Sequence, residues 1–176
     1  RRLARSMRKS AFRASLDEDF VAVLEGCAAP RGPDAGTWLV ADMQAAYARL
    51  HRLGVAHSFE LWDAERLIGG LYGLALGRVF FAESMFSRVP DASKMLLVIA
   101  GEQLARRGFR LIDAQVASPH LLRMGAELWP RARFMKELAG ALAEEPSEPL
   151  EPLDEDLRTP AGALISRAAV EQVPAL

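Results

Sequence analysis

Hydrophobic residues recur with a period of two through the middle of the chain. His57–Trp62 alternates polar and apolar residues, Arg66–Leu76 is a long apolar run, and Val79–Glu83 follows the turn at Gly77–Arg78. Short runs of this kind, joined by tight turns, predict an antiparallel meander. Three glycines interrupt the second run and indicate a bulge or the close approach of another backbone or a ligand. They are Gly69, Gly70 and Gly73.

The segments on either side of this meander follow the period of a helix. Ser15–Glu18 has the form of a capping box, which predicts a helix over 16–27. Apolar spacing, together with Pro and Gly at the ends, predicts the remaining elements. These are helices over 41–53, 94–107, 119–125 and 130–143, and a buried strand over 110–116. The order predicts an α+β fold with a mixed, mostly antiparallel sheet flanked by helices.

The composition is that of one globular domain. The chain has 176 residues, of which 51% are hydrophobic and 26% charged. The single cysteine, Cys27, excludes an internal disulfide framework and favours a reducing, cytoplasmic compartment. The sequence shows no signal peptide and no apolar run near the ~20 residues that span a bilayer.

The net charge of −1 hides a strong asymmetry. Residues 1–13 carry six basic side chains and no acid, whereas residues 144–176 carry eight acids, two arginines and five prolines. We therefore expect a domain over 1–143 with a net charge of +5, followed by a disordered acidic tail over 144–176. A basic arm is typical of proteins that bind a polyanion such as RNA, although a solubilising role is the alternative.

Phe80–Arg88 combines large apolar residues with an acid, two serines and an arginine. Apolar groups beside a few placed polar ones are typical of a ligand pocket. The alternative is an edge strand in which Glu83 is simply solvated.

Asp113 and Gln115 stand two residues apart on the predicted strand over 110–116, so their side chains should leave the same face of the sheet. A carboxylate and an amide under an apolar helix are costly unless they are paired. If Glu83 shares that face, the cluster could bind an amine or a guanidinium. A purely structural hydrogen-bond network is the alternative.

Several common chemistries are missing from the sequence. The three histidines are scattered and Cys27 stands alone, which argues against a metal site. There is no P-loop, no G-x-G-x-x-G and no G-x-S-x-G. The order of the sheet resembles the acyl-CoA N-acetyltransferase core, but residues 84–93 lack the glycine-rich turn that binds a pyrophosphate there. A CoA ligand is therefore disfavoured.

Nine short segments, taken in their order and spacing, resemble the leucyl/phenylalanyl-tRNA–protein transferases, bacterial aminoacyltransferases of the N-end rule. The resemblance covers about residues 3–143. The segments are Ser6-Met7-Arg8-Lys9, Glu25-Gly26-Cys27-Ala28, Gly36-Thr37-Trp38, His57-Ser58-x-Glu60-x-Trp62, Gly69-Gly70-Leu71-Tyr72-Gly73, Glu83-Ser84-Met85-Phe86-Ser87-Arg88, Ala92-Ser93-Lys94, Leu111-Ile112-Asp113-x-Gln115 and Leu122-x-Met124-Gly125-Ala126.

The resemblance implies an acetyltransferase-like (GNAT-like) catalytic domain that has exchanged CoA for a tRNA end. It implies transfer of Leu or Phe, with Met as a further substrate, from aminoacyl-tRNA to the N-terminal Arg or Lys of an acceptor protein. The product would carry a new peptide bond and an N-degron. The enzyme would be a cytoplasmic monomer that needs no cofactor, metal or membrane.

Roles for individual residues follow from the same resemblance. Asp113 and Gln115 would lie at the reacting centre, where the glutamine oxygen draws a proton from the attacking amine and the aspartate orients it. Glu83 would hold the terminal adenosine or the incoming amine. Trp38 would pack on the 3′-terminal adenine. The pocket for the transferred side chain would be lined by Met85, Leu97, Ala100, Leu104 and Ile112. The basic arm would lie along the acceptor stem through Arg5, Arg8 and Lys9.

The chain departs from the family pattern in several places. Ala100 and Leu104 are smaller than the aromatic residues expected, Ala82 replaces a glycine, and Ser118-Pro119-His120 and Trp129-Pro130-Arg131 vary two motifs. The resemblance also leads us to expect a further N-terminal domain that this sequence lacks. Two alternatives follow: a catalytically silent module that binds tRNA or degrons, and an acyl-CoA N-acetyltransferase.

Overall fold

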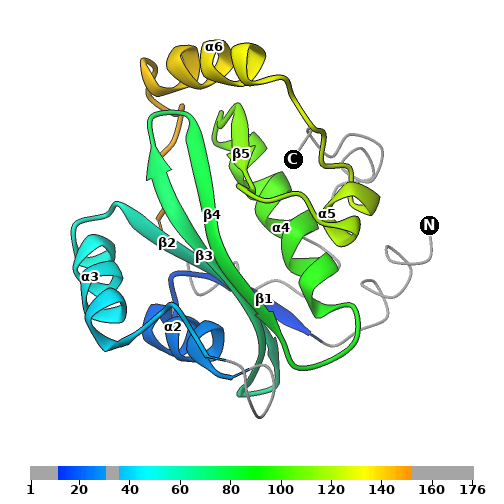
Figure 1. The fold of residues 1–176 in the computed structure, drawn as a ribbon. Helices are drawn as coiled ribbons and strands as arrows, with labels where there is room; N and C mark the ends of the chain where they lie inside the picture. The colour runs from blue at the N-terminus through cyan, green and yellow to red at the C-terminus, as the bar shows by residue number, and fades with distance from the viewer. Residues whose placement is uncertain (1–11, 31–35, 152–176) are drawn as a thin grey trace.

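The computed structural model describes residues 12–30 and 36–151. Five strands form one sheet whose spatial order is the order of the chain (Figure 1). The first four strands pair antiparallel, and the last pair is parallel. The strands are β1 (Arg13–Leu16), β2 (Ala56–Asp63), β3 (Arg66–Leu76), β4 (Val79–Ser87) and β5 (Leu111–Asp113). The predicted α+β class, with its mixed and mostly antiparallel sheet, is confirmed.

Helices cover both faces of the sheet, with α2 and α3 on one face and α4 on the other (Figure 1). The helices are α2 (Phe20–Ala28), α3 (Ala41–Arg52), α4 (Ala92–Arg106), α5 (Pro119–Arg123) and α6 (Arg131–Leu142). None of the helices within residues 12–30 and 36–151 combines the length and the apolar character that crossing a bilayer needs.

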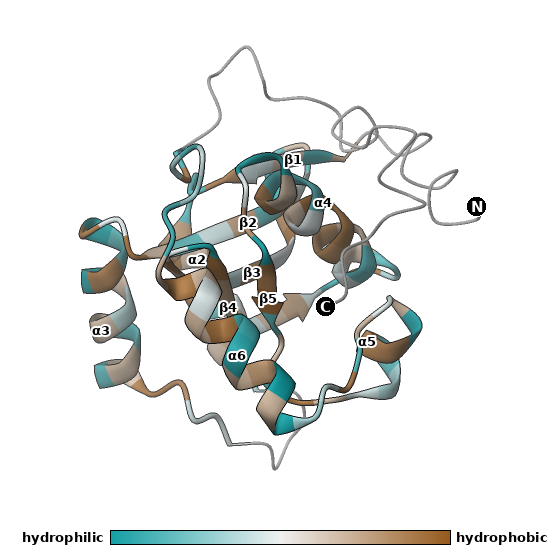
Figure 2. Cartoon of the chain, turned by 90° about the horizontal axis from the view of Figure 1, so that it is seen from above, coloured by the Kyte–Doolittle hydropathy of each residue, from teal (hydrophilic) through white to brown (hydrophobic). Residues whose placement is uncertain are grey.

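The apolar core is divided by the sheet. On one face, Met95, Leu96 and Ile99 of α4 pack against Phe59 and Phe80 of the strands. The opposite face belongs to a second cluster, built mainly from α2, α3 and the other side of β2 and β3. A third, small cluster attaches α6 to β4 and β5. Only part of α6 contributes to it, and the helix carries both hydrophilic and hydrophobic residues (Figure 2).

Two of the three strand glycines allow close approaches, as the sequence predicts. The ring of Phe86 lies between α2 and β3, where a Cβ on Gly70 would stand 2.7 Å from it and a Cβ on Gly26 would also collide. A Cβ on Gly73 would collide with the carbonyl oxygen of Phe81. The pairing of β3 with β4 is irregular between Tyr72 and Gly73, which is the predicted bulge.

The predicted capping box at Ser15–Glu18 is wrong, because this segment contains strand β1 rather than the start of a helix. The hydroxyl of Ser15 donates to the buried Oε2 of Glu60 at 2.6 Å instead of capping a helix. Helix α2 begins later, at Phe20, and Asp19 caps it by accepting from the N–H of Ala22 at 2.9 Å.

Residues 144–151 pack on the domain, although the sequence assigns them to the disordered tail. Glu144 bonds Arg78 at 2.5 Å and Arg110 at 3.1 Å. The N–H of Ser147 donates to the carbonyl of Arg107 at 2.9 Å, and Leu150 is buried in the α4 cluster. The rest of the tail, residues 152–176, lies outside the described residues.

The basic arm also lies outside the described residues, and with it Arg5, Arg8 and Lys9. Arg13, counted as its last basic residue, belongs to β1. Its guanidinium bonds the carboxylate of Glu18 and stands 5.1 Å from the centre of the Trp62 ring.

Candidate active site

An opening between β4 and β5 forms the candidate site. Strand β5 pairs with β4 only at Val79–Phe81, whereas β4 continues to Ser87. From Ala82 onward, β4 therefore has no strand partner on that side among the described residues. A cavity of about 350 Å³ lies in this opening, with α4 along one wall.

Glu83 enters this cavity because it is the extra residue of the β4 bulge. Tyr72 pairs with Ser84 and Gly73 with Ala82, so Glu83 has no partner in the register with β3. A bulge changes the direction of a side chain relative to a regular strand. Glu83 lines the cavity and accepts a hydrogen bond from the Tyr47 hydroxyl at 3.0 Å.

The Tyr47 phenol stays protonated and so remains a hydrogen-bond donor to Glu83. Burial, and next the charge of Glu83, raise the pKa of the Tyr47 phenol to about 12. The hydroxyl therefore keeps its proton at neutral pH. The long-range contact between α3 and β4 has no signature in the sequence, so Tyr47 is not among the predicted site residues.

The apolar wall of the cavity contains all five residues predicted for the amino-acid pocket. Three of them come from consecutive turns of α4 and are almost fully buried. The predicted residues are Met85, Leu97, Ala100, Leu104 and Ile112. Three further large apolar residues of the lining were not predicted, Leu71, Val116 and Leu121, whereas Phe80 belongs to the stretch Phe80–Arg88 whose composition predicts a pocket. The pairing of Leu71 with Met85 in the meander could have indicated the first of these.

Trp38 stands at the edge of the same cavity. Its side chain is 54% exposed, which is unusual for the largest apolar side chain. The ring meets Tyr47 edge-on, with 6.4 Å between the centroids. Trp38 therefore offers an open aromatic face beside the pocket.

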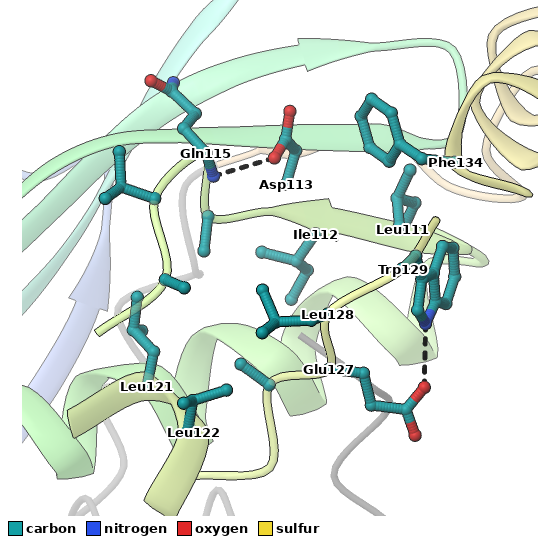
Figure 3. A pocket seen from close by; sticks show the side chains of 14 residues that line it. Leu111, Ile112, Asp113, Gln115, Leu121, Leu122, Glu127, Leu128, Trp129 and Phe134 are labelled. Carbon is teal, nitrogen blue, oxygen red and sulfur yellow. Dashed lines mark hydrogen bonds between the residues drawn. The ribbon is translucent and has the colours of Figure 1, made fainter. Parts of the chain in front are cut away.

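Asp113 and Gln115 are adjacent, but not in the way the sequence predicts. Strand β5 ends at Asp113, and Gln115 has left-handed backbone geometry with φ of 61°. Oδ1 of Asp113 accepts from the backbone N–H of Gln115 at 2.8 Å (Figure 3). This local bond competes with strand pairing and ends the strand.

The prediction that Asp113 and Gln115 share a buried face under an apolar helix is therefore wrong. Gln115 is exposed and Asp113 half-buried. Of their neighbours, Ile112 belongs to the α4 cluster, whereas Leu111 packs on the α6 side with Val79.

A second cavity, of about 410 Å³, lies next to the first and is drawn in Figure 3. Asp113 lines this second cavity, Glu83 lines the first, and Gln115 lines both. The segment 112–116 is thus a shared wall, with Ile112, Ala114, Gln115 and Val116 lining both cavities.

Glu83, Asp113 and Gln115 each keep side-chain atoms that are available for hydrogen bonds to a substrate. Among the described residues, Oδ2 of Asp113, Oε1 of Glu83 and the side-chain amide of Gln115 have no hydrogen-bond partner. Such oxygens can accept hydrogen bonds from an amine. The described residues contain no cluster of three or more His, Cys, Asp or Glu side chains suited to a metal ion.

Most of the chain is similar in sequence to one family of known proteins. The sequence model of the family described as leucyl/phenylalanyl-tRNA protein transferase matches residues 1–139. The leucyl/phenylalanyl-tRNA–protein transferase of Alkalilimnicola ehrlichii is 56% identical over 143 residues, and that of Nitrosomonas eutropha 48% identical over 148. These alignments cover 81% and 84% of this chain but only 55% and 63% of the two relatives. The chain thus spans less than two thirds of their length.

Among solved structures, the aminoglycoside N-acetyltransferase AAC(6')-Iy is similar in two complexes. The TM-scores are 0.43 and 0.41, at 17% and 15% sequence identity. The alignments cover 81% and 80% of this chain and 96% and 91% of the acetyltransferase chains.

Proposed function

The chain belongs to the leucyl/phenylalanyl-tRNA protein transferase family, and on that premise we propose that it takes part in transferring Leu or Phe from aminoacyl-tRNA to the N-terminal Arg or Lys of an acceptor protein. The observation that carries this proposal is the first cavity, where Glu83 and Gln115 stand beside an apolar pocket. Such a site suits a substrate with an apolar side chain next to a reacting polar centre.

The proposed reaction is an aminolysis of an ester. The α-amine of the acceptor attacks the carbonyl carbon of the aminoacyl ester, a C–N bond forms and the C–O bond to the tRNA breaks. The ribose oxygen leaves and takes up one proton, while the amine loses one. Because the ester is already activated, alignment of the two reactants supplies much of the acceleration, and no cofactor is needed.

Gln115 and Asp113 divide the work at the reacting centre in this proposal. The side-chain oxygen of Gln115 accepts a hydrogen bond from the attacking amine and draws its proton away. Asp113 positions Gln115, because its carboxylate bonds the Gln115 backbone N–H and supports the left-handed turn. An isolated non-glycine residue in that conformation costs about 1–2 kcal/mol.

The remaining roles follow the walls of the cavity. The transferred Leu or Phe side chain occupies the pocket of Met85, Leu97, Ala100, Leu104 and Ile112. The exposed ring of Trp38 stacks on the terminal adenine, a contact worth ~1–3 kcal/mol per base. Glu83, oriented by Tyr47, binds the substrate at the polar side of the pocket. We further infer a cytoplasmic enzyme that acts as a monomer.

Asp113→Ala tests this assignment in an assay with labelled Leu-tRNA and a peptide that begins with Arg. We expect the transfer rate to fall about 10²–10⁴-fold, because Gln115 loses the bond that holds it in place and an impaired proton transfer typically costs this much. The Kd for the tRNA should stay near the wild-type value, because Asp113 does not line the first cavity. The matched control is Asp63→Ala, an exposed aspartate at the end of β2.

An unchanged transfer rate in Asp113→Ala would contradict the proposed role. Binding of tRNA without any transfer by the wild-type protein would instead support a silent binding module. Acetylation of an amine from acetyl-CoA would overturn both.

A further inference from the structure

The residues that line the second cavity carry acids and no cation, and the nearby Arg133 lies outside the lining. The lining includes two carboxylates, Asp113 and Glu127, and no Lys, Arg or His. Apolar and aromatic side chains form most of the remaining wall, among them Leu128, Trp129 and Phe134. A long aliphatic chain with a positive end matches this combination, because its stem packs on apolar groups while its charge pairs with a carboxylate.

Glu127 and Trp129 form a prearranged pair in this cavity. The indole Nε1 of Trp129 donates to Oε2 of Glu127 at 2.8 Å (Figure 3). This bond holds the carboxylate beside the indole ring. A carboxylate has about four acceptor positions, so Glu127 can accept further hydrogen bonds.

The chain itself places a guanidinium on this pair. The Arg133 guanidinium carbon lies 4.0 Å from the centre of the Trp129 ring, and Nη1 lies 3.9 Å from Oε2 of Glu127. Arg133 is not among the residues that line the cavity. A planar cation over an indole face gains cation–π attraction, most strongly for tryptophan.

We propose that this cavity binds the side chain of the acceptor's N-terminal Arg or Lys, an inference that rests on the proposed function. The α-amine lies at the wall formed by Asp113 and Gln115, and the side-chain cation lies beside Glu127 and Trp129. In Figure 3 the carboxylate of Asp113 lies near the top of the view and that of Glu127 near the bottom, with Ile112 and Leu128 at heights between them. The aliphatic stem of the acceptor residue crosses the apolar wall between them.

The surroundings of the cavity suit a polypeptide. Val116 is 73% exposed, Leu128 is 74% exposed, and Leu122 is also exposed. All three line the cavity. Exposed apolar residues gathered at one site indicate contact with another molecule. They offer contacts to the residues that follow the acceptor's N-terminus.

Peptide binding by Glu127→Gln tests the proposal. Two fluorescent peptides are used that differ only in an N-terminal Arg or its neutral analogue citrulline, and their Kd values are measured with the full chain. We expect the Kd for the Arg peptide to rise about tenfold in Glu127→Gln, the loss typical of one hydrogen bond to a charged group. The Kd for the citrulline peptide should change less than about twofold.

The matched control is Glu145→Gln, which removes an exposed carboxylate that does not line the cavity. It should leave both Kd values unchanged. Glu127 is exposed, so its substitution does not threaten the fold. If Glu127→Gln leaves the preference for Arg over citrulline intact, or if the wild type shows no such preference, the proposal is overturned.

Kinetics separate this inference from the proposed function. In transfer assays, Glu127→Gln should raise the KM for the Arg peptide and leave the KM for Leu-tRNA and kcat unchanged. A wild-type chain that prefers the Arg peptide through Glu127 but transfers nothing would refute the proposed function alone. Transfer that shows the same KM in wild type and Glu127→Gln would refute the cavity assignment alone.

Discussion

At the scale of single residues, Glu60 is the most unusual buried group. It lies fully buried on β2 and accepts hydrogen bonds from the hydroxyls of Ser15, at 2.6 Å, and Ser58. The indole of Trp62 donates in turn to Ser15 at 2.8 Å. Burial raises the pKa of the Glu60 carboxyl to about 7, although the two serine bonds oppose this. The attachment of β1 to β2 therefore includes a carboxyl that titrates near neutral pH.

This raised pKa predicts a pH-dependent stability. The folded protein holds the Glu60 proton more tightly than the unfolded chain, so its free energy of unfolding falls as pH rises from about 4.5 to about 7. Above that range the loss is complete, at about 3 kcal/mol. Glu60→Gln cannot ionise and should show a flatter profile between pH 5 and pH 8 in urea unfolding.

The control for Glu60→Gln is a substitution that neutralises an exposed carboxylate. Glu145→Gln should follow the wild-type profile at every pH, because Glu145 is exposed. Parallel profiles for wild type and Glu60→Gln would show that Glu60 is not the titrating group.

At the scale of elements, the bulge between β3 and β4 connects the sheet to the site. Gly73→Ala would push a Cβ against the carbonyl oxygen of Phe81, two residues before Glu83. We expect the free energy of unfolding to fall by about 1–3 kcal/mol, the usual cost of overpacking. The transfer rate should fall as well, because the bulge sets the direction of Glu83.

Gly140→Ala provides the control for this substitution. Gly140 lies within α6, and a Cβ there meets no atom within 4 Å. Alanine should therefore stabilise the helix by up to about 1 kcal/mol. If Gly73→Ala unfolds at the same urea concentration as the wild type, the bulge does not depend on this glycine.

The elements with strong periodicity were predictable. The meander β2–β4 and helices α3 and α4 appear close to their expected positions, because alternation and helical spacing extend over many residues in each. Strand β1 was not predictable, because four residues are too few to show the alternation of a strand and Ser15–Glu18 has the pattern of a helix cap. The early end of β5 follows from the bond between the Asp113 carboxylate and the Gln115 backbone N–H, which the apolar spacing of residues 110–116 does not encode.

The two cavities were predictable to different degrees. The apolar lining of the first follows from family resemblance and the wide apolar face of α4. The second is formed where the segment around α5 and the start of α6 pack near β5. Glu127 and Trp129 meet there in a segment without helix, strand or turn, and neither spacing nor resemblance indicates this contact.

At the scale of the whole molecule, charge separates the basic arm from the acidic tail. Replacing Arg5, Arg8 and Lys9 together by Ala should weaken tRNA binding if the arm lies on the acceptor stem. Each lost phosphate contact should reduce the slope of log K against log salt by about 0.7–0.9. The measurement is the Kd for tRNA at several salt concentrations. An unchanged slope would remove the arm from the tRNA site.

The shared wall at 112–116 has a consequence for how this protein can evolve. Ile112 lines both cavities, so any substitution there reshapes the pocket proposed for the delivered amino acid and the pocket proposed for the acceptor terminus together. A substitution of Ile112 alone therefore cannot change the preference for the delivered amino acid without also changing the preference for the acceptor. A lineage that adopts a different amino acid by changing Ile112 must also accept altered recipients, or acquire a compensating change elsewhere in the second cavity.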